Sequence, residues 1–328
     1  MSGTLAMPPS AVPAGARATR TRLGAADQAY RALLASLATA VFVVVAVIVF
    51  ELARGAGPSI HAFGWGFLTG TDWDPVAEKF GALPYLYGTL MSSFLALLIA
   101  LPLGIGTAVY LSEIAPARVG SVLAFVVELL ASIPSIVFGI WGVFVLAPFL
   151  RGAIEPWLIA HLGFLPLFRG FPFGLGMLNA ALVLAIMIIP TLVTISREVL
   201  RAMPRTLREA ALALGSTRAE AIAVTLDAAR PGILGAVILA LGRALGETMA
   251  VTMVIGNSNR ISLSLLAPGA TLASLVANEF TEATGKLYLS ALIEIALVLF
   301  GITIVVNAVA RLLVLWATGG RRDVAGAA

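Results

Sequence analysis

Long apolar stretches alternate with short polar segments along most of this chain. A hydrocarbon core about 30 Å thick requires about 20 apolar residues when a helix crosses it. Stretches of suitable length lie at residues 32–52, 86–111, 119–150, 178–195, 233–255 and 287–315. The pattern therefore predicts an all-α polytopic membrane protein with about six transmembrane helices.

The composition leaves no room for a sizeable soluble domain. The chain has 328 residues, of which 60% are hydrophobic and 12% are charged. Soluble domains carry about 25% charged residues, so this chain lacks the charge that a water-facing surface needs. The absence of cysteine excludes disulfides and thiolate metal sites, and the two histidines, His61 and His161, lie far apart in predicted loops. We therefore expect no metal site.

The distribution of Lys and Arg predicts the orientation of the spans. One side of the membrane, including both chain ends, is predicted to hold 14 of these residues and the other side 6. Cytoplasmic loops carry the excess of positive charge, so we expect both termini in the cytoplasm. The expected parts are a disordered tail (1–30), the first helix with an extracytoplasmic loop (31–85), a core of the remaining helices (86–317) with a cytoplasmic loop (197–230), and a cytoplasmic tail (318–328).

The cytoplasmic loop carries signals for two short helices. Two residue pairs have the spacing of a capping box, Thr206 with Glu209 and Thr217 with Glu220. Between them Gly215 is expected to adopt the left-handed conformation that ends a helix. Pro231 suits the first turn of the next membrane helix. We expect two short helices, joined by a turn, on the cytoplasmic face.

The first of these helices is rich in small and apolar residues, among them Ala210, Ala211 and Leu214. A helix this short is marginally stable alone and needs a surface to pack against. That surface is either a partner protein or the lipid head groups of the membrane, and composition alone does not separate the two.

The same segment resembles a known motif. Glu209-Ala210-Ala211 followed by Gly215 is similar to the EAA loop of ABC importer permeases. The resemblance implies that the loop forms a coupling helix, which in that family sits in a groove of a cytoplasmic ATPase subunit. The chain departs from the family pattern at Asp227, where the family has a proline.

Two charged residues, Arg243 and Glu247, lie within the apolar stretch 233–255. Their spacing places them on one face of a helix, where we expect an ion pair. An unpaired ion in mid-membrane costs about 2.5–3.5 kcal/mol on insertion scales, so such residues usually have a function. The alternative is a self-neutralising pair that fixes helix packing, for which Gly242 and Gly246 provide the GxxxG spacing.

In the functional interpretation, Arg243 serves an anion pathway, because the guanidinium fork matches phosphate oxygens. Glu247 would then hold Arg243 and compete with the passing anion. Further polar residues in predicted spans are candidates for a pathway or an interface: Glu128, Ser132, Ser135 and Glu294.

Three segments, 242–257, 128–142 and 88–116, resemble the fifth, third and second helices of the phosphate-specific ABC permease of the PstC type. The resemblance implies the type I ABC importer permease fold in a bacterial plasma membrane. It implies a second permease subunit in a heterodimer, a cytoplasmic ATPase dimer and an extracytoplasmic phosphate-binding protein, which would contact loops 55–85, 151–175 and 257–286. Arg243 and Glu247 fall on charged fifth-helix positions that the family uses in transport.

The chain lacks the motifs of an enzyme. No phosphate-binding P-loop is present, and no Ser-His-Asp constellation appears. We expect no cofactor on this chain, with ATP bound and hydrolysed by the partner subunit. The alternatives are a permease for sulfate, molybdate or another oxyanion, the sister phosphate permease subunit, an ion-coupled secondary transporter and a membrane-embedded enzyme.

Overall fold

The computed structural model describes the backbone of residues 14–319 and the side chains of residues 27–316. The chain divides into two compact units, 1–54 and 55–328. Several residues used to predict orientation have side chains outside the described part: Arg17, Arg20, Arg22, Arg321 and Arg322. Most of the expected C-terminal tail and residues 1–13 of the expected N-terminal tail lie there as well.

Within the described residues, six helical stretches are long and apolar enough to cross a membrane. They are Asp27–Phe63, Leu83–Ile114, Ser135–Leu162, Met177–Ala202, Arg218–Leu245 and Lys286–Trp316. The prediction of an all-α protein with about six spans is confirmed. Three of the expected elements have different bounds, and each difference is local.

The first difference concerns helix α1 (Ala14–Phe63), which begins well inside the tail that we expected to be disordered up to residue 30. Its stretch up to Arg54 belongs to the first unit, and the remainder to the second. Within the second unit, the Ser59 backbone N–H donates to Ser290 Oγ over 3.0 Å. Ser290 Oγ in turn donates to the Gly55 carbonyl over 2.9 Å. These bonds join the end of α1 to α13 (Lys286–Gly319).

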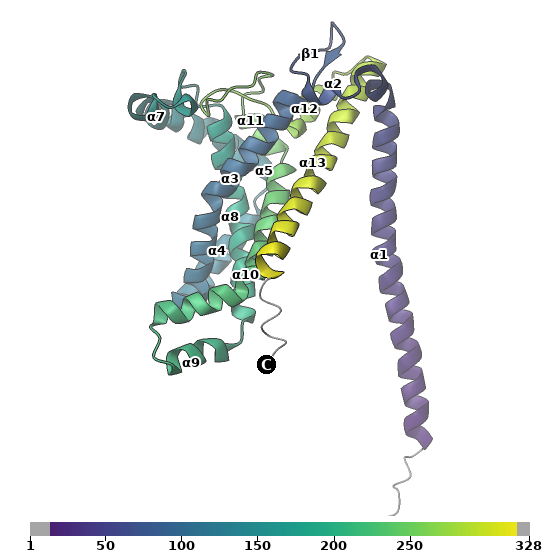
Figure 1. Cartoon of the computed structure of the whole chain (residues 1–328), viewed down its shortest axis with the longest axis vertical. Coiled ribbons are helices and arrows are strands. Elements are labelled where there is room, and N and C mark those ends of the chain that lie inside the picture. The colour runs from purple at the N-terminus through teal and green to yellow at the C-terminus, as the bar shows by residue number, and fades with distance from the viewer. Residues whose placement is uncertain (1–13, 320–328) are drawn as a thin grey trace, which may run out of the picture. The chain divides into compact units, whose positions relative to one another are not determined.

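Three helices form the core of the second unit: α3 (Leu83–Val109), α8 (Met177–Ala202) and α10 (Arg218–Leu245). Helix α8 packs against both α3 and α10, and Figure 1 shows the three helices together. Small residues such as Ala100, Ala180 and Ala240 are fully buried there and let the backbones approach closely. α3 continues directly into a π-helical turn, η1 (Tyr110–Ile114).

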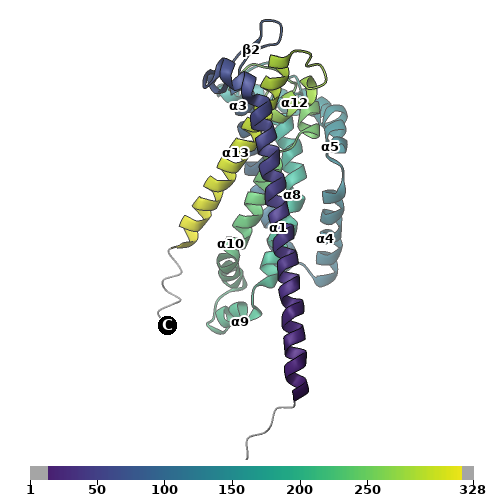
Figure 2. The same cartoon turned by 90° about the vertical axis from the view of Figure 1, so that its right-hand side faces the viewer.

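The predicted span 119–150 is not one helix. It is divided into α4 (Ala117–Ser132) and α5 (Ser135–Trp141) by two extended residues, Ile133 and Pro134, and Figure 2 shows the break. Proline has no N–H to donate and disfavours the helical conformation of the residue before it. The chain then continues through η2 (Gly142–Leu146), α6 (Ala147–Phe149), η3 (Leu150–Ile154) and α7 (Glu155–Leu162).

The predicted span 233–255 is also interrupted. Helix α10 ends at Leu245, and a short helix, α11 (Met249–Val254), follows after three residues. Glycine and threonine, which are weak helix formers, flank Glu247 in this break. At its other end α10 begins at Arg218 and runs through Pro231, so the expected second short helix is the first part of α10 rather than a separate element.

The remaining elements gather at the end of the second unit opposite α9 (Arg205–Ala213) (Figure 1). They are α2 (Gly66–Thr69), η4 (Pro166–Phe168), α12 (Leu272–Glu279) and the antiparallel strands β1 (Trp73–Asp74) and β2 (Lys79–Phe80). Trp73 Nε1 and the Tyr288 hydroxyl both donate to Glu279 Oε2, over 2.6 and 2.7 Å. These bonds fix the hairpin against the start of α13.

The loop between η4 and α8 is held by buried polar groups. Glu155 Oε2 accepts a hydrogen bond from the Gly174 backbone N–H over 2.9 Å. Asn179 Nδ2 donates to the Gly174 carbonyl over 2.8 Å, and both side chains are buried. The backbone of the loop is thus anchored at Gly174.

Candidate functional site

The short helix α9 is the element predicted to couple the chain to an ATPase. It begins after Pro204, and no side chain caps its first turn. The expected capping box of Thr206 and Glu209 is therefore wrong, because Thr206 already lies inside the helix. The expected box at Thr217 is confirmed, since the Thr217 backbone N–H donates to Glu220 Oε2 over 2.7 Å.

The end of α9 follows the prediction made for Gly215. This residue has φ +86°, the left-handed conformation that glycine adopts without strain. The Gly215 N–H donates to the Leu212 carbonyl and the Ser216 N–H to the Ala211 carbonyl, over 3.0 and 3.2 Å. This is the Schellman pattern, which satisfies the last carbonyls of a helix. The turn brings the chain back towards α10.

Most of α9 faces away from the rest of the unit. Ala211 is its buried residue, while Glu209, Ala210 and Gly215 are exposed. Two leucines at the end of the helix, Leu212 and Leu214, are also exposed, by 44% and 89%. The chain itself thus leaves these apolar side chains uncovered, which makes them a candidate contact for a partner or for lipid.

An ion pair joins α9 to the membrane helices. Arg208 Nη2 contacts Glu113 Oε2, and the Glu113 side chain is only 2% exposed. Glu113 lies in η1, at the end of the span that starts with α3. The sequence did not lead us to predict a role for this residue. The available signal was a lone acidic residue at the polar end of an apolar stretch.

A second ion pair involves the candidate Glu128. Arg197 Nη1 lies 3.8 Å from Glu128 Oε1 and connects α8 with α4. The Arg197 side chain is buried, whereas that of Glu128 is 56% exposed. Arg197 was assigned to the cytoplasmic loop but is part of helix α8.

Arg243 and Glu247 do not form the expected ion pair. Arg243 Nη1 donates to Thr191 Oγ1 of α8 over 3.3 Å. Glu247 Oε1 accepts from the Ala250 N–H over 3.4 Å, and none of the ion pairs among the described residues includes either side chain. The physical reason is the end of α10 at Leu245, because the shared helix face of residues four apart exists only while the helix continues.

A further polar residue near Arg243 was not predicted from the sequence. Asn307 of α13 lies against Gly242, where an added Cβ atom would lie 3.6 Å from the Asn307 amide nitrogen. Asn307 Oδ1 is buried without a hydrogen-bond partner in the part of the chain that the structure describes. The sequence did carry a signal for this residue, because Asn307 is the single side-chain amide within the apolar stretch 287–315. The GxxxG glycine Gly242 therefore accommodates a polar side chain within the same chain.

The two candidate serines flank the break between α4 and α5. Ser132 is exposed, and its hydroxyl donates to the Leu129 carbonyl over 2.7 Å. Ser135 is half-buried at the start of α5. In the same segment, a Cβ atom on Gly139 would lie 3.1 Å from the Ala250 Cα atom of α11. The small residues of α5 thus allow it to pack closely on α11.

Similarity to known proteins places this architecture in a family. Residues 100–317 match the model of the binding-protein-dependent transport system inner membrane component. The chain belongs to this family. The matched region includes α9, both residues of the Arg208–Glu113 ion pair and the α10–α11 break.

Individual relatives extend over nearly the whole chain. The phosphate transport system permease protein PstC of Mesorhizobium japonicum is 46% identical over 90% of this chain and 91% of its own length. PstC of Pasteurella multocida is 45% identical over 84% of this chain and 87% of its own. PstC of Xylella fastidiosa is 42% identical over 96% and 98%. The resemblance to the PstC type of permease is thereby confirmed.

A solved structure supports the fold. The chain is similar to a chain of the MetNI methionine ABC transporter in an inward-facing conformation, with a TM-score of 0.52. The similarity covers 70% of this chain and 93% of that chain at 17% sequence identity. The expected type I ABC importer permease fold is confirmed.

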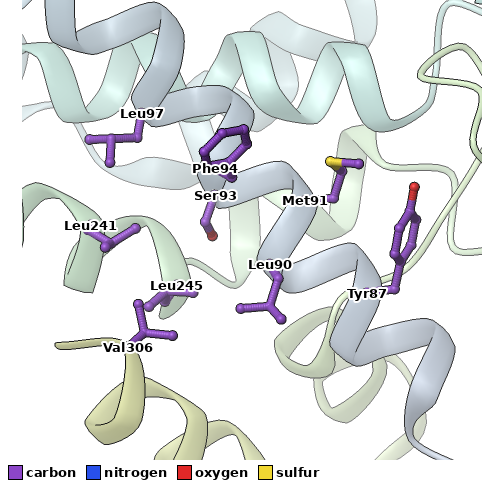
Figure 3. A pocket seen from close by; sticks show the side chains of 9 residues that line it. All are labelled: Tyr87, Leu90, Met91, Ser93, Phe94, Leu97, Leu241, Leu245 and Val306. Atoms are coloured by element: carbon purple, nitrogen blue, oxygen red, sulfur yellow. The ribbon is translucent and has the colours of Figure 1, made fainter. Parts of the chain in front are cut away.

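This chain also has an apolar groove, whose lining is unfavourable for binding an anion. It has a volume of about 440 Å³ and lies between α3, α10 and α13 (Figure 3). Its lining consists of Tyr87, Leu90, Met91, Ser93, Phe94, Leu97, Leu241, Leu245 and Val306. These lining residues include no cation, and the Tyr87 hydroxyl already donates to the Ser262 carbonyl. Binding of phosphate there would require removing its charge from water without compensation.

Proposed function

We propose that this chain is a membrane-spanning permease subunit of an ATP-driven phosphate importer and forms the translocation pathway with a second permease subunit. The family and the names of its relatives support a phosphate permease. The observation that carries the proposal concerns Arg243. This cation lies within a membrane span, and its hydrogen-bond partner is the neutral hydroxyl of Thr191 and not a carboxylate.

Arg243 combines the properties that an anion pathway needs. Its charge is not neutralised by an ion pair within the described residues, and its side chain is exposed in the isolated chain. An intramembrane cation of this kind faces a polar cavity or a partner rather than lipid. We infer that the exposed face bearing Arg243 meets the second permease subunit, and that the phosphate oxygens pass between them and contact the guanidinium.

The energy for transport comes from a separate ATPase in this proposal. The chain carries no P-loop. Helix α9 presents the exposed Glu209 and Ala210 together with Leu212 and Leu214, while Ala211 of the same motif is buried beneath them. We infer that Glu209, Ala210, Ala211 and Gly215 shape the surface on which the ATPase dimer docks. The opposite end of the unit, with the β1–β2 hairpin and α12, then faces an extracytoplasmic phosphate-binding protein.

This arrangement implies an orientation in the bacterial inner membrane. With α9 in the cytoplasm, the polar ends of α3 and α10 that adjoin it are cytoplasmic as well. The excess of Lys and Arg on that side supports the assignment. Both termini are then cytoplasmic.

The test uses the complete complex in liposomes, with both permease subunits, the ATPase and the binding protein. We expect ATP-dependent uptake of radiolabelled phosphate, and stimulation of ATP hydrolysis by phosphate but not by sulfate or molybdate. Equal stimulation by sulfate or molybdate would reassign the substrate to another oxyanion. Uptake by this chain alone, driven by an ion gradient, would replace the proposal with a secondary transporter.

A further inference from the structure

We propose that the ion pair between Arg208 and Glu113 is the link through which movement of α9 reaches the membrane-spanning helix α3. In this proposal the ion pair determines how many phosphate ions are transported for each ATP that is hydrolysed. The inference rests on the proposed function, because it assumes that α9 is moved by an ATPase. It assigns a positioning role to Glu113.

The burial of Glu113 makes this contact specific. Its carboxylate is almost completely removed from solvent and contacts the Arg208 guanidinium. A buried carboxylate without a counter-ion is strongly destabilising. Loss of Arg208, whose own side chain is 40% exposed, would therefore leave the buried Glu113 carboxylate uncompensated. The two side chains are therefore expected to move together. The ion pair between Arg197 and Glu128 is longer and has a largely exposed carboxylate, so it lacks this property.

Glu113 belongs to an unusual backbone segment. In η1 the Ala115 N–H donates to the Tyr110 carbonyl over 2.8 Å, a bond that spans five residues instead of four. Single π-helical turns of this type occur frequently at functional sites. Because η1 continues α3 without interruption, a pull on Glu113 acts directly on the end of that transmembrane helix.

Apart from the ion pair, α9 packs mainly against α10. Ala211 is the buried residue of the helix, and a polar cavity of about 610 Å³ lies between α9, η1 and the start of α4. Arg208 and Glu113 are both in its lining, together with Arg201, Arg205 and Thr225. The cavity leaves α9 room to shift, and the ion pair crosses this region as a defined connection.

Close packing continues the connection towards Arg243. At Gly104 of α3, an added Cβ atom would lie 2.9 Å from the Leu192 Cβ atom of α8, so the two helices touch there. The neighbouring residue, Thr191, accepts the hydrogen bond from Arg243. A displacement of α3 thus presses on the segment of α8 that holds the intramembrane cation.

The experiment measures phosphate uptake and ATP hydrolysis in the same liposomes that contain the complete complex. The variants are Glu113→Gln, Arg208→Gln and the charge swap Glu113→Arg with Arg208→Glu. The matched control is Asp27→Asn, which breaks an exposed ion pair with Arg31 in α1. Copurification of the ATPase subunit reports assembly for each variant.

We expect both single variants to keep the ATPase subunit and to hydrolyse ATP. Phosphate transported per ATP should fall by about tenfold, a size typical of energetic coupling between sites. The charge swap should recover most of the ratio, and Asp27→Asn should match the unmodified chain.

Two results would overturn the inference. One is an unchanged ratio of phosphate to ATP in both single variants while the unmodified complex transports normally. The other is loss of the ATPase subunit from both single variants and from the charge swap, which would leave the pair a structural role only. Failure of the unmodified complex to transport phosphate would instead count against the proposed function itself.

Discussion

At the scale of single residues, the position of Arg243 next to a helix break changes its chemistry. A continuous helix would have neutralised the guanidinium with Glu247, whereas here Glu247 accepts from a backbone N–H of α11. Arg243 keeps one hydrogen bond to Thr191 and has donors left for a ligand. The break thus separates a pair that would otherwise compete with an anion for the same cation.

Replacement of Arg243 tests this role. In Arg243→Gln, phosphate uptake should fall about ten- to hundredfold, because a hydrogen bond to a charged group contributes about 1.5–3 kcal/mol. Arg243→Lys should give an intermediate rate, since lysine keeps the charge but not the planar fork. Uptake of radiolabelled phosphate by the reconstituted complex measures both. The control is Arg311→Gln, at an exposed arginine in the last part of α13, and normal uptake in Arg243→Gln would contradict the role.

At the scale of elements, α9 is a short helix that the rest of the chain covers only in part. Its nine residues are held by packing against α10, by one buried alanine and by one ion pair. Short helices in water are unstable without a partner surface. The exposed Leu212 and Leu214 complete a surface that a partner would cover. The exposed leucines support docking of a protein on α9. A substitution at Leu214 distinguishes a protein surface from the alternative, contact with lipid.

The substitution Leu214→Glu tests docking. The residue is 89% exposed in the chain, so the fold should tolerate the change, but a buried charge in an interface should weaken ATPase binding about tenfold or more. The affinity of the solubilised permease heterodimer for the ATPase subunit is the measurement. Val76→Glu, at a 95% exposed position of the hairpin, is the control. Equal affinities for the two variants would assign α9 to the lipid surface.

At the scale of the whole molecule, the proposed function assigns different tasks to the two ends of the second unit. One end carries α9, and the other carries the hairpin, α7 and α12 (Figure 1). The helices between them bring the Arg208–Glu113 ion pair and Arg243 into one packed body. A transporter that draws its energy from a cytoplasmic partner needs this separation, because substrate delivery and ATP hydrolysis take place on opposite sides of the membrane.

The absence of cysteine makes the orientation directly testable. Single cysteines at Ala213 and Val76, both exposed, should react with a membrane-impermeant maleimide from opposite sides. We expect Ala213→Cys to label only in inverted membrane vesicles and Val76→Cys only from the outside of intact cells. The reverse pattern would invert the topology, and labelling of both from one side would contradict the assignment of spans. The unsubstituted chain provides the background.

The candidate site was only partly visible in the sequence. The short helix that carries the EAA residues and its end at the left-handed Gly215 were predicted correctly, because a helix end depends on a few neighbouring residues. The coupling role of the EAA residues stays a prediction. Glu113 was missed because its partner, Arg208, lies 95 positions further along the chain. The predicted ion pair between Arg243 and Glu247 was wrong because α10 ends at Leu245, between the two residues. The average hydrophobicity of the stretch 233–255 does not reveal such a short interruption of the helix.

By itself, the sequence determined that the chain crosses a membrane about six times, where most spans lie and where α9 turns back. These features follow from local quantities, namely the length of apolar stretches, the positions of proline and glycine, and backbone conformation. Only the tertiary structure decided which charges meet, because that depends on how α3, α8, α9 and α10 pack against one another. It joined Arg208 to Glu113 and Arg243 to Thr191, contacts between residues that no local pattern brings together.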